Sequence, residues 1–216
     1  MFLCNRFVFV HLPKTGGTFV RTLLSEFIPK DWDVAINPGH GTTKEIPETY
    51  KNLPVIGFIR NPWDYYVSWY NYFLTRHKQD PGIEPGSDLF LVASDSGRND
   101  FKTTILNTLK NDVLRSLDIG GLSYLYLGMY GINLEQVYKP PHNTLIGKIE
   151  HIRSDLVRML GDVGVEISAE FQNQIQSRPA TNKFEHPYYR EYYDDELREL
   201  IQYKDRIIIS KYGYAF

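Results

Sequence analysis

The sequence predicts an α/β fold in which helices flank a mostly parallel β-sheet. Short apolar runs at residues 7–10, 54–60 and 143–149 are rich in β-branched and aromatic residues and are bounded by turn residues, a pattern typical of buried strands. Apolar residues at helical spacing follow each run. Strands that alternate with helices favour a mostly parallel sheet with helices on its faces.

The first of these strands ends in an unusual turn. Residues 13–18 read Pro-Lys-Thr-Gly-Gly-Thr, and helical spacing begins directly after them. Two glycines let the backbone turn sharply and approach a ligand closely, while the helix N-terminus favours an anion. The lysine adds a positive charge and the threonines add hydroxyl donors. The turn therefore predicts a P-loop-like phosphate site, the alternative being a plain strand–turn–helix link. The residues assigned to it are Lys14, Thr15, Gly16, Gly17 and Thr18.

Length and composition limit the function classes. The 216 residues suffice for one domain with a sizeable core, and we expect a single domain over residues 1–216. A net charge of −2 argues against a polybasic nucleic-acid binder. One cysteine, Cys4, excludes an intrachain disulfide and a cysteine cluster for zinc, and we expect it to pack beside the first strand. No signal peptide and no run near the ~20 apolar residues of a membrane span is visible, so we expect a soluble, cytoplasmic chain.

Periodicity and turn composition predict the elements in the rest of the chain. A short strand is expected in 31–36 and a turn or helix start at 43–47. Ser154 is expected to cap a helix that runs to Leu160, and Asp194 to open the last helix, over 196–203. The other expected helices cover 63–77, 101–117, 122–129 and 166–177, and the expected loops cover 78–100 and 178–187.

A second constellation lies at the end of the strand over 54–60. Arg60 closes this strand, where open α/β sheets bind ligands. Ser68 follows eight residues later, within the next predicted helix, from which it can face the strand end. An arginine fork and a hydroxyl make a good receptor for a phosphate monoester. A surface ion pair and a helix-surface serine are the alternative.

Both motifs resemble those of sulfotransferases that use 3′-phosphoadenosine 5′-phosphosulfate (PAPS), particularly carbohydrate and Golgi-type enzymes and their bacterial relatives. HLPKTGGT resembles their 5′-phosphosulfate loop, and VIGFIRNPWDYYVSWYNYF resembles their 3′-phosphate motif. LIGKIEHIRSDLVRMLGDVGV and the closing residues 188–216 are similar to the family as well, whereas 78–140 carry little likeness. The nucleotide-triphosphatase pattern G-x-x-x-x-G-K-[ST] differs, because Lys14 precedes both glycines.

The resemblance implies a single sulfotransferase-fold domain and a metal-free, in-line transfer of a sulfuryl group from PAPS to an acceptor hydroxyl or amine. It assigns the 5′-phosphate to the loop over 14–18 and the 3′-phosphate to Arg60 and Ser68. Lys14 would also neutralise charge on the leaving oxygen. Golgi relatives carry a membrane anchor, so this chain is expected to be either a soluble bacterial-type enzyme or a trimmed catalytic domain, and its start at Met1 favours the first. The acceptor is expected to be a small molecule, a carbohydrate or a glycolipid, with no nucleic-acid partner, while the oligomeric state stays open.

The resemblance also points to a base. His40 lies in a glycine-flanked segment similar to a G-H segment of related enzymes, and an imidazole suits proton removal near neutral pH. Glu150 and His151 are the reserve pair, whereas His11, at the end of the first strand, is expected to pack. The R-K-G segment of cytosolic sulfotransferases is not found. Residues that could close on the donor instead are Arg178, Lys183 and Arg190.

Other readings remain. A small P-loop kinase acting on a nucleotide or metabolite is the alternative enzyme, although it needs a lysine after the glycines and an Asp that holds Mg²⁺. A non-catalytic relative that binds an anion or a protein partner is the third reading. The aromatic residues of 63–73 and 122–130 suit stacking on sugar rings or lining a lipid cleft, or packing in a core.

Overall fold

The computed structural model describes residues 1–37, 41–79, 88–109, 143–181 and 186–216. The chain divides into two compact units. Unit 1 comprises Met1–Arg60 and Leu134–Lys183, and unit 2 comprises Asn61–Asn133 and Phe184–Phe216. The single domain expected over residues 1–216 stays a prediction.

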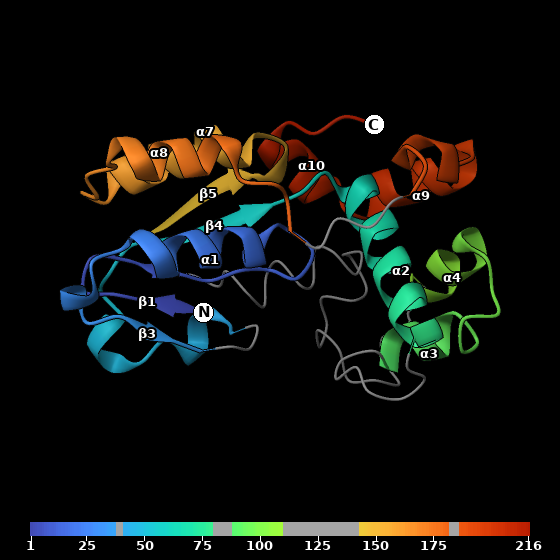
Figure 1. The fold of residues 1–216 in the computed structure, drawn as a ribbon. Helices are drawn as coiled ribbons and strands as arrows, with labels where there is room; N and C mark the ends of the chain where they lie inside the picture. The colour runs from blue at the N-terminus through green and yellow to red at the C-terminus, as the bar shows by residue number, and fades with distance from the viewer. Residues whose placement is uncertain (38–40, 80–87, 110–142, 182–185) are drawn as a thin grey trace. The chain divides into compact units, whose positions relative to one another are not determined.

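Unit 1 contains a sheet whose described strands have the order β3-β1-β2-β4-β5 (Figure 1). The strands are β1 (Phe2–Leu3), β2 (Val8–Phe9), β3 (Ala35–Ile36), β4 (Val55–Ile59) and β5 (Thr144–Lys148). β2 and β5 are both parallel to β4, while β1 is antiparallel to β2 and to β3. Four of these strands therefore run in one direction and β1 opposes them, which confirms the predicted mostly parallel sheet.

The core of unit 1 follows the alternation of side chains along the strands. Phe7 and Phe9 share one buried cluster with Ile56 and Phe58, as expected for residues two apart on one face. Three helices complete this cluster: α1 (Gly17–Phe27), α7 (Ile152–Asp162) and α8 (Ala169–Ser177). Cys4 is buried in the same cluster, as predicted. Burial raises the pKa of its thiol, which disfavours the reactive thiolate.

Unit 2 is helical in its described part. Its elements are α2 (Pro62–Gln79), α3 (Asp88–Ala93), α4 (Phe101–Thr108), the 3₁₀ turn η6 (Tyr189–Tyr192), α9 (Asp195–Lys204) and α10 (Arg206–Tyr212). Aromatic contacts join them: Trp69 meets Phe90, and Tyr70 meets Phe101. Five aromatic residues of α2 are buried, which makes them core residues: Trp63, Tyr65, Tyr66, Trp69 and Tyr70.

Several predicted elements have other bounds. The loop expected over 78–100 contains α3, and a further helix, α10, follows the one opened by Asp194. β1 was not predicted, because two residues are too few for a period to show. α7 begins at Ile152 rather than behind Ser154, whose hydroxyl donates to the carbonyl of His151. The C-terminal part of the helix expected over 101–117, and all of that over 122–129, lie outside the described residues.

The remaining short elements of unit 1 are 3₁₀ turns. They are η1 (Lys30–Trp32), η2 (Thr43–Glu45), η3 (Glu48–Tyr50) and η5 (Ile149–His151). η2 confirms the turn expected at 43–47, and Thr42 and Glu45 close it with a capping box. The strand expected in 31–36 is confined to Ala35 and Ile36.

Candidate functional site

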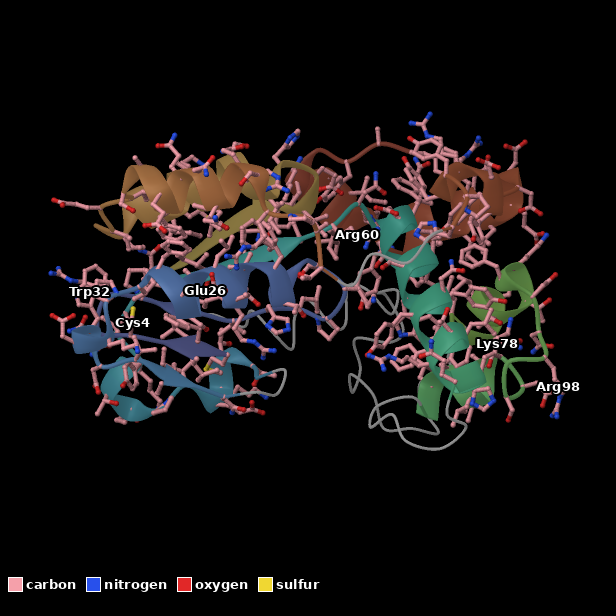
Figure 2. All side chains as sticks on the ribbon, in the orientation of Figure 1. Cys4, Glu26, Trp32, Arg60, Lys78 and Arg98 are labelled. Carbon is pink, nitrogen blue, oxygen red and sulfur yellow. The ribbon has the colours of Figure 1, made fainter. Side chains whose placement is uncertain are left out.

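Three chain segments leave the carboxyl edge of the sheet in unit 1. Because β2, β4 and β5 are parallel neighbours, their C-terminal ends share one edge, which is where open α/β sheets bind ligands. β2 leads into the turn before α1, β4 leads into Arg60, and β5 leads into η5. Figure 2 labels Arg60 at the end of β4. The predicted phosphate loop and Arg60 thus belong to one edge.

The loop after β2 has a strained, specific backbone. Lys14 has φ 67° and Gly16 has φ 80°, so two left-handed residues flank Thr15. This conformation costs a lysine about 1–2 kcal/mol, whereas glycine adopts it freely. Turns that contain left-handed residues can gather successive N–H groups into a concave anion receptor. Gly16 is also the N-cap of α1, and no side chain caps this helix start.

Hydrogen bonds from Thr15 and Arg60 hold the loop. The Thr15 hydroxyl is fully buried and donates to the carbonyl of Leu12 at 2.7 Å. Nη1 of Arg60 donates to the carbonyl of Lys14 at 3.2 Å. The hydroxyl hydrogen of Thr15, which sequence reasoning assigned to a ligand, is used inside the chain. A contact of Thr15 with a bound anion would therefore have to come from its main-chain N–H.

The left-handed backbone favours glycine at position 16, and close packing requires it at position 17. A Cβ atom on Gly16 would lie 2.6 Å from Cδ1 of Ile152, and one on Gly17 would lie 2.2 Å from Cγ of His11. His11 is buried and stacks on Phe9, with ring centroids 5.7 Å apart. The packing predicted for His11 is confirmed. Its contact with Gly17 escaped the sequence, since only folding brings a ring at the end of β2 against the first residue of α1.

The other predicted site residues lie in different parts of the chain. Ser68 is half-buried on α2, in unit 2, so its joint action with Arg60 stays a prediction. His40 lies outside the described residues. Glu150 and His151 are exposed on η5, which puts the reserve pair on the carboxyl edge of the sheet that also carries the loop.

The cations considered for closing on the donor have different surroundings. Arg178 forms an ion pair with Glu26 of α1, which Figure 2 labels, and also donates to Gln174. This hydrogen-bonded pair lowers the pKa of Glu26 and raises that of Arg178. Arg190 belongs to unit 2 and donates to the carbonyl of Phe216 at 2.6 Å. Lys183 lies outside the described residues.

Within the described ranges, no three or more His, Cys, Asp or Glu side chains are grouped as a metal site would require. No helix in this part of the chain has the length and apolarity needed to cross a membrane.

Comparisons with known proteins identify the fold. No family model matches the chain, and no curated protein sequence matches it. Among solved structures, it is similar to mouse sulfotransferase SULT7A1 complexed with PAP, at 15% sequence identity and a TM-score of 0.55. The match covers 98% of this chain and 89% of the mouse chain. Although so few residues are identical, the match extends over nearly the whole chain, and the chain therefore has a sulfotransferase-type fold.

Proposed function

We propose that this protein is a PAPS-dependent sulfotransferase that sulfates a hydroxyl or amine of a carbohydrate or glycolipid acceptor. The observation that carries the proposal is the loop over 13–17, which joins β2 to α1 at the carboxyl edge of a sulfotransferase-type fold. Its two left-handed residues and the start of α1 form a receptor suited to a phosphosulfate. We keep the expectation of a soluble, cytoplasmic, bacterial-type enzyme as part of this proposal.

In this mechanism the loop binds the 5′-phosphosulfate through main-chain N–H groups and the Lys14 ammonium. The acceptor oxygen or nitrogen attacks sulfur, and the bond from sulfur to the 5′-phosphate oxygen breaks. Charge grows on that oxygen, so a cation beside it stabilises the transition state more than the ground state. Positioning and charge stabilisation supply most of the rate, as in phosphoryl transfer. The product that leaves is adenosine 3′,5′-bisphosphate.

The 3′-phosphate of the donor is assigned to Arg60 and Ser68. Arg60 follows the carboxyl end of β4, and a guanidinium binds a phosphate with two parallel hydrogen bonds. This phosphate distinguishes PAPS from ATP, which has none at the 3′ position. His40 is assigned as the base that takes the acceptor proton, with Glu150 and His151 in reserve.

Calorimetry on the wild-type protein tests the donor assignment. Adenosine 3′,5′-bisphosphate should bind at least about tenfold more tightly than 5′-AMP, because a charged hydrogen bond contributes about 1.5–3 kcal/mol. It should also bind more tightly than ATP with Mg²⁺. Equal affinity for 5′-AMP and the bisphosphate removes the 3′-phosphate assignment, and a preference for ATP with Mg²⁺ supports a kinase.

An acceptor screen with labelled PAPS tests the activity. Transfer of label to a carbohydrate or glycolipid supports the full proposal, and transfer to another small molecule changes only the acceptor class. Tight bisphosphate binding with no transfer to water or to any acceptor supports the non-catalytic reading.

A further inference from the structure

Arg60 contacts the main chain of the very loop that is proposed to bind the other end of the donor. Its Nη1 atom lies 3.2 Å from the carbonyl oxygen of Lys14, within unit 1 and across 46 residues of sequence. This bond takes one of the five N–H donors that a guanidinium carries. The same group is therefore able to bind a backbone carbonyl and a phosphate together.

The hydrogen bond from Arg60 to the Lys14 carbonyl also sets the direction of the N–H of Thr15. The C=O of Lys14 and the N–H of Thr15 belong to one planar trans peptide, in which they point in opposite directions. A bond from Arg60 to the carbonyl therefore turns the Thr15 N–H away from the guanidinium. On the N–H side of this peptide, the hydrogen bond from the Thr15 hydroxyl to the carbonyl of Leu12 holds Thr15 in place. The peptide is thus held at both ends.

The conformation that Arg60 holds is one that Lys14 adopts reluctantly. Lys14 is left-handed, with φ 67°, and a non-glycine residue persists there only where its surroundings enforce it. Two residues later, Gly16 is left-handed as well, with φ 80°. The bond from Arg60 acts on Lys14 directly, at the carbonyl oxygen of this residue.

We propose that Arg60 is a positioning residue for the 5′-phosphosulfate loop, in addition to its assigned contact with the 3′-phosphate. The inference rests on the proposed function. Through the Lys14 carbonyl, Arg60 pre-organises the N–H groups that bind the 5′ end of the donor. The Arg60 side chain then couples the two phosphate sites, because the loop keeps its binding conformation only while Arg60, directly after β4, holds the Lys14 carbonyl.

Ligands that carry a single phosphate test this dual role by calorimetry. Arg60→Ala should weaken 5′-AMP about tenfold, because the loop loses one charged hydrogen bond, and should weaken 3′-AMP as well. Ser68→Ala is the matched control, since it should weaken 3′-AMP and leave 5′-AMP unchanged. If Arg60→Ala leaves the affinity for 5′-AMP within twofold of wild type, the positioning role is wrong. If the wild type binds neither 5′-AMP nor the bisphosphate, the proposed function is wrong, and the positioning role that rests on it is wrong as well.

A second measurement separates positioning from a general loss of stability. Amide hydrogen exchange at Thr15 and Gly16 in the ligand-free protein should be faster in Arg60→Ala, whereas exchange in the core of β5 should be unchanged. Arg60→Lys serves if the alanine variant fails to fold. A lysine keeps the charge but lacks the fork, so 5′-AMP should again bind more weakly than in wild type. Unchanged exchange at Thr15 together with unchanged 5′-AMP affinity in Arg60→Lys overturns the proposal.

Discussion

The ring of His11 lies against the main chain of Gly17, so that a Cβ atom at residue 17 would stand 2.2 Å from His11 Cγ and 2.7 Å from its Cβ. These ring and Cβ atoms are close to the backbone and cannot swing aside as the end of a flexible chain does. The buried imidazole therefore packs directly against the first residue of α1 and leaves no space there for a side chain.

Gly17→Ala should consequently displace the loop. We expect the free energy of unfolding to fall by about 1–3 kcal/mol, as in other overpacked cores, and the affinity for adenosine 3′,5′-bisphosphate to fall with it. Gly161→Ala is the matched control, because Gly161 lies in α7 with nothing within 4 Å of an added Cβ. That change should be neutral or stabilise by about 0.5–1 kcal/mol. Equal denaturation midpoints for Gly17→Ala and Gly161→Ala would contradict this expectation, because they would show that the His11 side chain moves aside at little cost.

Lys14 should matter more for turnover than for binding. Lys14→Ala is expected to lower kcat by about 10²–10³, the usual cost of losing one group that stabilises developing charge, while product affinity changes less. Lys14→Gly should lower kcat equally. Its free energy of unfolding should be about 1 kcal/mol higher than that of Lys14→Ala, because glycine adopts the left-handed conformation at position 14 without strain. Steady-state kinetics and chemical denaturation measure both effects. A kcat within threefold of wild type in both variants would contradict the role.

Activity should not depend on a divalent metal. In the proposed transfer, the loop N–H groups and Lys14 neutralise the leaving oxygen, so treatment with a chelator followed by desalting should leave kcat unchanged. If the treated enzyme is inactive and Mg²⁺ restores it, the kinase reading replaces the sulfotransferase.

His40→Ala should lower kcat by about 10²–10⁴, the usual contribution of a positioned base, with donor affinity nearly unchanged because the base touches the acceptor. The rise of kcat with pH through the histidine range should disappear in this variant. If His40→Ala keeps more than about a tenth of wild-type kcat while chemistry is rate-limiting, the base is to be sought at Glu150 and His151.

The ion pair of Glu26 and Arg178 should make the stability of unit 1 depend on pH. The hydrogen bond from Arg178 lowers the pKa of Glu26 in the folded protein, so the pair contributes above the unfolded-state pKa of glutamate. That contribution is lost as the pH falls through the lower folded value. Wild type should therefore be more stable than Glu26→Gln at neutral pH, and the difference should shrink below about pH 4.5.

Thermal denaturation between pH 2 and 7 measures this difference. Glu170→Gln, at an exposed position near the start of α8, is the control for a lost carboxylate. Arg178→Ala should reproduce the stability loss of Glu26→Gln and leave donor affinity unchanged. A selective loss of donor affinity would instead support Arg178 as one of the residues that close on the donor.

Local sequence signals predicted the elements that have a clear period or terminator. The apolar runs that became β4 and β5 are continuous, Pro62 starts α2, and Asp194 caps α9 with a bond to the N–H of Leu197. Where two signals competed, the prediction was wrong. Ser154 has the residue type of a cap, yet α7 starts earlier because η5 runs directly into it, with His151 as the cap position.

The sequence by itself predicted a turn between a strand and a helix within residues 13–18, where α1 begins at Gly17, and placed Arg60 at the end of a buried strand. These are properties of neighbouring residues, which chain connectivity alone holds together. Only the tertiary structure decided that Arg60 holds the Lys14 carbonyl, that Lys14 is left-handed, and that His11 requires glycine at position 17. Each of these depends on the pairing of β4 beside β2 or on the packing of α1 against the sheet. Such contacts join groups through space, and no spacing along the chain encodes their distance.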